Sequence, residues 1–150
     1  MTQDDLLIAA RALSFLQPAP AGPIRVGIVY ASSDPRSVEE ADNLQQLLAG
    51  GLRVGNLIML PVKVKIEDLA AANVQVVLLT GGVGNDGRIS VATKAKRIPC
   101  ITDDIAQVED GNCAMGVRSQ PRIEIFVNRA AAANSGTSFA TVFRMLITEI

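Results

Sequence analysis

Apolar runs of strand length alternate with segments of helical periodicity along most of this chain, and this alternation limits the fold more than any other feature. The expected strands are 24–30, 54–62, 74–80 and 98–102. Helices are expected at 3–16, 66–73 and 88–97, in a helical turn at 103–110, and in a segment that Ser33 or Asp34 caps and Gly50 ends. Because the connections are short, the pattern predicts an α/β fold with an open, mostly parallel sheet flanked by helices.

The C-terminal part departs from this alternation. Two further strands, 113–118 and 122–127, are separated by only three residues, which is too short for a parallel crossover and predicts an antiparallel hairpin. C-terminal helices should follow at 129–134 and from Thr137 or Ser138 to the end. The last helix would carry one apolar stripe, which packs on the core and could also close a homodimer, made of Phe139, Val142, Phe143, Leu146, Ile147 and Ile150. We find no repeat, so residues 1–150 are expected to form a single domain.

Composition excludes several classes of function. The 14 basic residues are balanced by 15 acidic ones, and aromatic residues make up 3% of the chain, so nucleic acid is not an expected partner. Histidine is absent, which removes the usual general base of Ser and Cys hydrolases and the commonest metal ligand. We therefore expect no catalytic residues, no metal and no cofactor. No apolar run approaches the length of a membrane span, so direct membrane insertion is not expected.

A glycine-rich loop, TGGVGNDG at 80–87, joins an expected strand to an expected helix. Gly82, Gly84 and Gly87 have the spacing G-x-G-x-x-G, which is typical of dinucleotide-binding loops and raises the alternative of a nucleotide-binding enzyme. Against it, the loop follows the third strand and Asp86 would place negative charge beside the phosphates. The other interpretation is a set of turns, with Asn85 or Asp86 capping the next helix.

The carboxyl ends of parallel strands form the usual ligand crevice of an open α/β sheet. Short hydroxyls, backbone amides and one carboxylate gather there and suit a small polar ligand, although they equally suit a solvated rim. The candidate ligand-binding residues are Ser32, Ser33, Thr80, Gly81, Gly82, Gly84, Asn85 and Asp103. Asp103 and Asp104 are adjacent and point in different directions, so helix capping is the better role for this pair than acid–base catalysis.

The two cysteines, Cys100 and Cys113, flank the expected turn at 103–110. They would form a disulfide if the two strand ends are neighbours, whereas in a reducing compartment they would be buried thiols. Without histidine they cannot form a four-ligand zinc site unless carboxylates complete it.

Three segments, IPCITDD, VEDGNCAMGV and RIEIFVNRAAAANSGTSFATVFRMLITEI, resemble the YfiR-like family of bacterial periplasmic regulators in the order and type of their residues, and IRVGIVYASSDP resembles that family's opening strand. The resemblance extends over residues 5–150. It departs where Asn112 and Cys113 follow Gly111 in place of paired glycines. The glycine loop is also richer in glycine than in that family and is similar to loops of ABC-type periplasmic substrate-binding proteins.

The resemblance implies a non-catalytic periplasmic binding or regulatory domain that recognises a small polar ligand or a membrane-bound sensor, such as the periplasmic domain of a diguanylate cyclase. The alternative is a small substrate-binding protein that holds a polar solute for a transporter. A periplasmic location requires that a signal peptide has been removed, since the segment before Arg11 carries acidic residues where a signal peptide is basic. If Met1 is native, a cytoplasmic location is expected.

Overall fold

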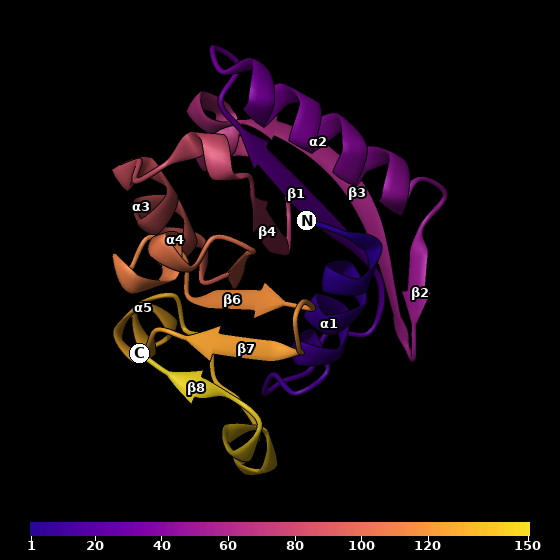
Figure 1. Cartoon of the computed structure of the whole chain (residues 1–150), viewed down its shortest axis with the longest axis vertical. Helices are drawn as coiled ribbons and strands as arrows, with labels where there is room; N and C mark the ends of the chain where they lie inside the picture. Colours follow the sequence, from indigo (N-terminus) through magenta and orange to yellow (C-terminus); the bar gives the residue numbers. More distant parts are fainter.

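The computed structural model describes residues 1–150, and an eight-stranded sheet runs through it in the order β2-β3-β1-β4-β5-β6-β7-β8 (Figure 1). Along the sheet from β3 through β1, β4 and β5 to β6, each strand is parallel to its neighbour. β2 runs antiparallel to β3, and β7 runs antiparallel to β6. The strands are β1 Gly22–Tyr30, β2 Leu52–Val54, β3 Leu57–Lys65, β4 Val76–Leu79, β5 Cys100–Thr102, β6 Met115–Arg118, β7 Glu124–Val127 and β8 Thr148–Glu149. The expected mostly parallel α/β sheet with a C-terminal antiparallel hairpin is confirmed.

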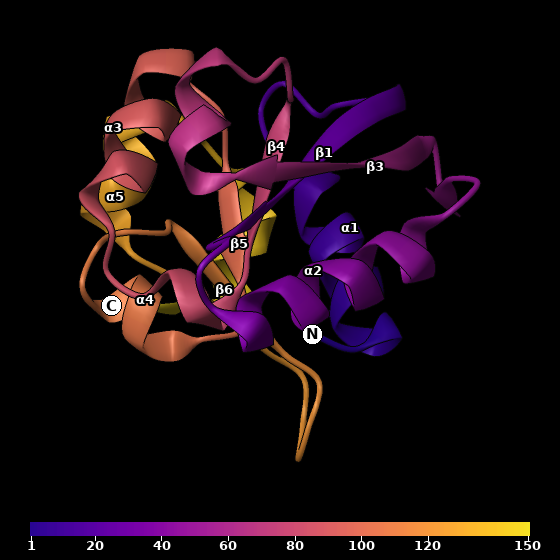
Figure 2. The ribbon, with the colours of Figure 1, turned by 90° about the horizontal axis from the view of Figure 1, so that it is seen from above.

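Helices cover both faces of the sheet. They are α1 Gln3–Leu13, α2 Pro35–Leu48, α3 Gly87–Lys96, α4 Ile105–Glu109 and α5 Arg129–Asn134, with 3-10 helices η1 Ile66–Ala71, η2 Gly81–Val83 and η3 Thr141–Met145. Figure 2 shows α1 and α2 on the same side of β3, and both contribute to the larger core of 23 buried residues. The smaller core of 13 residues lies with η1 and α3. None of these helices is both long and apolar enough to cross a bilayer.

Aspartates start the helices that follow the strands. Asp34, Asp86 and Asp104 are the N-caps of α2, α3 and α4, and each carboxylate accepts a backbone N–H two residues further on. Pro35, in the first turn of α2, already has the helical φ angle. In each of the three expected pairs the cap is the second residue, Asp34, Asp86 or Asp104, and not Ser33, Asn85 or Asp103.

The expected strand 54–62 is wrong at its start, because the chain reverses within it. β2 and β3 pair antiparallel across Gly55 and Asn56. Gly55 has a φ of 58°, which an L side chain rarely adopts, so the turn falls at this glycine. The expected helix 66–73 is the shorter 3-10 helix η1.

The expected final helix is also wrong. Phe139 forms a bridge with Leu16, and the Ala140 N–H donates to the Phe15 carbonyl, so this stretch is extended where the helix should begin. η3 is a single 3-10 turn, and β8 then pairs in parallel with β7. Phe143 is 1% exposed and stacks on Phe15, and this long-range packing outweighs the helical spacing of the apolar residues.

Candidate functional site

Thr80 follows β4 at the carboxyl edge of the sheet and is fully buried. Its hydroxyl donates to the Val29 carbonyl at 3.0 Å and lies 2.7 Å from the Ser37 hydroxyl of α2. Ser37 in turn accepts the Ala31 N–H at 2.8 Å. Thr80 therefore joins β1, β4 and α2 instead of facing a ligand.

Gly81 and Gly82 contact the first turns of α2. The Gly81 N–H donates to the Glu40 carboxylate at 3.1 Å. A Cβ on Gly82 would lie 2.5 Å from the Ser37 Cβ and 2.7 Å from a carboxylate oxygen of Asp34, so the helix leaves no room for a side chain there. The close approach requires glycine at position 82.

Two buried amides hold the rest of the glycine loop. Gly84 has a φ of 56°, and its carbonyl accepts from Gln107 Nε2 and from Asn112 Nδ2, both at 3.3 Å. Gln107 also donates to the Thr80 carbonyl at 3.2 Å and accepts from the Thr102 hydroxyl. Asn85 is exposed and its side chain makes no hydrogen bond within the chain. Gln107 and Asn112, which both follow β5 in the chain, therefore hold the loop in place.

Asp103 lies at the same edge, after β5. Its carboxylate is 2.8 Å from the Met1 ammonium group, which is 3.9 Å from the Glu40 carboxylate. Burial raises the pKa of Glu40, and the negative charge of Asp103 raises it further, although the Gly81 N–H opposes both. Chemically, the two carboxylates form a site for a cationic group.

Ser32 and Ser33 do not join these residues. Both are exposed, and the Ser32 hydroxyl is 3.4 Å from Glu67 of η1. The structure therefore joins Thr80, Gly81 and Gly82 directly to α2. Asp103 reaches α2 only through the Met1 ammonium group, and Ser32, Ser33 and Asn85 lie at the surface.

Sequence reasoning missed the four polar residues that hold the edge together, Ser37, Glu40, Gln107 and Asn112. One signal for Ser37 was present: it shares a helical face with Ala41, Leu44 and Leu48, all buried, and a serine on such a face needs a partner. Asn112 and Gln107 lie in a loop and a short helix without clear periodicity, and no sequence signal marks them.

The start of α3 bears on the dinucleotide interpretation. The Asp86 carboxylate accepts the Arg88 N–H at 3.0 Å and pairs with the Arg88 guanidinium at 2.7 Å. Hydrogen bonds from Arg88 lower the pKa of Asp86, so it is anionic at neutral pH. A pyrophosphate bound at this helix start would meet a carboxylate at the N–H groups it needs.

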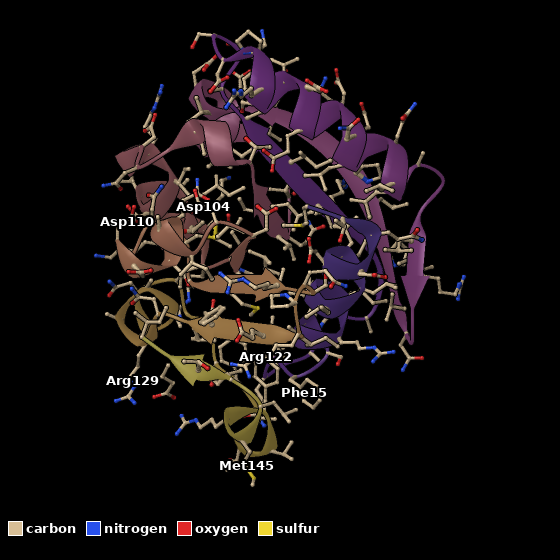
Figure 3. All side chains as sticks on the ribbon, viewed as in Figure 1. Phe15, Asp104, Asp110, Arg122, Arg129 and Met145 are labelled. Atoms are coloured by element: carbon tan, nitrogen blue, oxygen red, sulfur yellow. A yellow bond between two sulfur atoms is a disulfide. The ribbon has the colours of Figure 1, made fainter.

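Of the two alternatives for the cysteines, the disulfide is present, with Cys100 and Cys113 bonded and their Cα atoms 5.1 Å apart. It joins β5 to the segment entering β6. Asp104 and Asp110, labelled in Figure 3, stand at the two ends of α4 within the loop that the disulfide closes. No group of three or more Cys, Asp or Glu side chains is arranged to hold a metal ion.

Two hollows lie away from the strand-end edge. A cavity of about 300 Å³ lies beside the disulfide, between α3 and α5, and has a mixed polar and apolar lining that includes Ser90, Lys94 and Asn112. A groove of about 410 Å³ runs between η1 and α3 and is lined mainly by apolar groups, among them Ile66, Val91 and Ala95. None of the eight candidate ligand-binding residues lines either hollow, although Cys100 lines the cavity and Gly87 lines the groove.

The fold is similar to two solved structures. One is an ABC domain in complex with L-Trp from Streptococcus pneumonia, with a TM-score of 0.63 and 12% sequence identity over 98% of this chain. The other is a conserved domain protein from Vibrio cholerae O1 biovar eltor, with a TM-score of 0.59 and 12% identity over the same share. This chain spans 59% of the length of each. No protein-family model matches the sequence, and no curated protein matches it.

Proposed function

We propose that this protein is a non-catalytic, periplasmic binding domain of the YfiR-like type, which recognises a small polar ligand or a membrane-bound sensor and passes on the state of occupancy. The observation that carries the proposal is the engagement of the strand-end polar groups by one another. Thr80 and Gly84, where a substrate would be expected to bind, are tied to Ser37, Gln107 and Asn112. Because these groups satisfy one another's hydrogen bonds, they stabilise the edge of the sheet, and this structural role supports a protein that binds without catalysis.

The fold supports a small ligand as the bound species, because a domain solved in complex with L-Trp shares it. The Cys100–Cys113 disulfide supports export, since such bonds persist in oxidising compartments such as the periplasm. The membrane-bound sensor is proposed only because of the resemblance to the YfiR-like family, and the periplasmic domain of a diguanylate cyclase is an example of such a sensor.

A substrate-binding protein for a transporter is the second candidate. The same similarity of fold favours it, and the Glu40 and Asp103 carboxylates would suit a solute that carries an ammonium group.

Homodimerisation is also proposed, because Val142, Met145 and Leu146 are each at least 60% exposed around η3. Figure 3 shows Met145 pointing away from the body of the molecule.

A thermal-shift screen tests the proposal. The purified chain is heated with small polar metabolites, with nucleotides, and without additions. A binding domain should be stabilised in a concentration-dependent way by at least one metabolite class, because a ligand that binds only the native state raises the melting temperature. Stabilisation by NAD or ATP alone would instead support the nucleotide-binding enzyme.

A further inference from the structure

The cavity beside the disulfide contains a buried amide with one open position. Asn112 is 4% exposed, its N–H donates to Asp110 at 2.9 Å, and its Nδ2 donates to the Gly84 carbonyl at 3.3 Å. Because Gly84 offers a carbonyl, only the NH2 group of Asn112 can face it. Asn112 Oδ1 accepts no hydrogen bond from the chain, and Asn112 lines the cavity. No buried side-chain nitrogen or oxygen lacks a partner, so this oxygen is accessible from the cavity, where a donor from outside the chain can reach it.

The neighbouring hydroxyls of α3 offer the same chemistry. Ser90 donates its hydroxyl hydrogen to the Gly87 carbonyl at 3.1 Å, and Thr93 donates to the Ser90 carbonyl at 3.3 Å. Both residues line the cavity with their hydrogens already used, so what remains is acceptor capacity. A ligand that satisfies Asn112, Ser90 and Thr93 must supply several hydrogen-bond donors.

The charge of the cavity is set by one residue. Lys94 is the only ionisable group in the lining, and it forms none of the ion pairs of the structure. Lys94 is exposed, and an anionic group bound beside it would form a charge-assisted hydrogen bond that no carboxylate of the chain supplies. The volume of about 300 Å³ lies at the small end of the range of ligand sites.

We propose that this cavity binds a small hydroxylated carboxylate of the sugar-acid type, with its carboxylate on Lys94 and its hydroxyls donating to Asn112 Oδ1 and the α3 hydroxyls. The assignment deepens the proposed function and rests on it for the claim that the protein binds a small polar ligand. It also gives a route for a signal, because the amide that would hold the ligand also holds the glycine loop at Gly84.

Isothermal titration of the full chain with D-gluconate tests the assignment, with D-glucose and pentanoate as comparators that lack the carboxylate or the hydroxyls. We expect D-gluconate to bind at least about tenfold more tightly than either comparator, since each lacks one of the two recognition elements. Equal affinity for the three compounds, or no heat with D-gluconate, overturns the assignment.

Lys94→Gln should weaken D-gluconate binding by about tenfold or more, whereas Lys65→Gln, which removes an exposed lysine outside the cavity, should change it less than about twofold. Ser90→Ala is a second variant that keeps α3 helical, and it should weaken binding by a few-fold. Unchanged affinity in Lys94→Gln or in Ser90→Ala contradicts the assignment. Stabilisation by another metabolite without D-gluconate binding overturns this cavity's role and leaves the proposed function standing.

Discussion

The hydroxyls of Ser37 and Thr80 lie 2.7 Å apart, and both side chains are fully buried although their residues are 43 positions apart in the sequence. This contact fixes the N-terminal turn of α2 on the end of β4. It also brings Glu40 to the backbone of Gly81. The edge of the sheet that sequence reasoning assigns to a ligand is therefore a packed junction between helix and loop.

Removal of the Ser37 hydroxyl tests that junction. Ser37→Ala should lower the free energy of unfolding by about 1–3 kcal/mol, because the part-buried Ala31 N–H and the buried Thr80 hydroxyl both lose a partner. Urea denaturation measures the loss. Thr80→Ser, which retains a hydroxyl, is the conservative control for the other side of the contact. A Ser37→Ala variant as stable as the native chain would show that the contact does not hold the edge.

The glycine loop offers a matched pair of substitutions. Gly84→Ala should cost about 1–3 kcal/mol, because its φ of 56° is strained for an L side chain. Gly87→Ala should be neutral or slightly stabilising, since Gly87 begins α3 and an added Cβ there meets no atom within 4 Å. Thermal unfolding compares the two variants. Equal effects would contradict the backbone geometry of the loop.

The disulfide should stabilise the sheet beyond β5. Cys100 and Cys113 are 13 residues apart, and a loop of that size is worth about 3 kcal/mol through the entropy of the unfolded chain. The double variant Cys100→Ala/Cys113→Ala should therefore melt at a lower temperature than the oxidised chain. The intact mass of the native protein, measured without a reducing agent, tests whether the bond forms. A mass higher by two hydrogens than that of the disulfide-bonded chain would show that the disulfide is absent.

Glu40 should make stability depend on pH. Burial raises its pKa above the ordinary value of 4.5, so the folded state binds a proton more tightly than the unfolded state. The stabilisation that this tighter proton binding gives the folded state is fully present below the pKa of Glu40 in the unfolded chain. It is lost as the pH rises through the pKa of Glu40 in the folded chain. Glu40→Gln should consequently gain stability relative to the native chain as the pH rises from about 4 to about 7. Urea unfolding at several pH values measures it, and parallel profiles for the two proteins would exclude the effect.

The exposed apolar residues around η3 predict self-association. The native chain should sediment as a dimer at micromolar concentration, and Leu146→Asp should sediment as a monomer with unchanged thermal stability, because Leu146 is 61% exposed. Analytical ultracentrifugation of both proteins at several concentrations measures whether each one sediments as a monomer or as a dimer. A native chain that stays monomeric over the same concentrations would remove the dimer from the proposal.

The sequence predicted the parallel part of the sheet well, because apolar continuity in β1 and β4 reports burial on both faces. It failed at the C-terminus, where Phe143 packs on Phe15, more than a hundred residues earlier in the chain. The site was predicted only in part for a related reason. Strand ends can be located from the sequence, but whether Thr80 faces solvent or Ser37 depends on where α2 lies.

The central claim is that this protein binds a molecule without transforming it. Proton NMR of a stabilising metabolite from the thermal-shift screen, followed overnight with the purified chain, tests that claim most directly. We predict saturable line broadening of the metabolite signals with all of the compound recovered. New product signals that grow in proportion to protein concentration, and that Asp103→Asn abolishes, would contradict it.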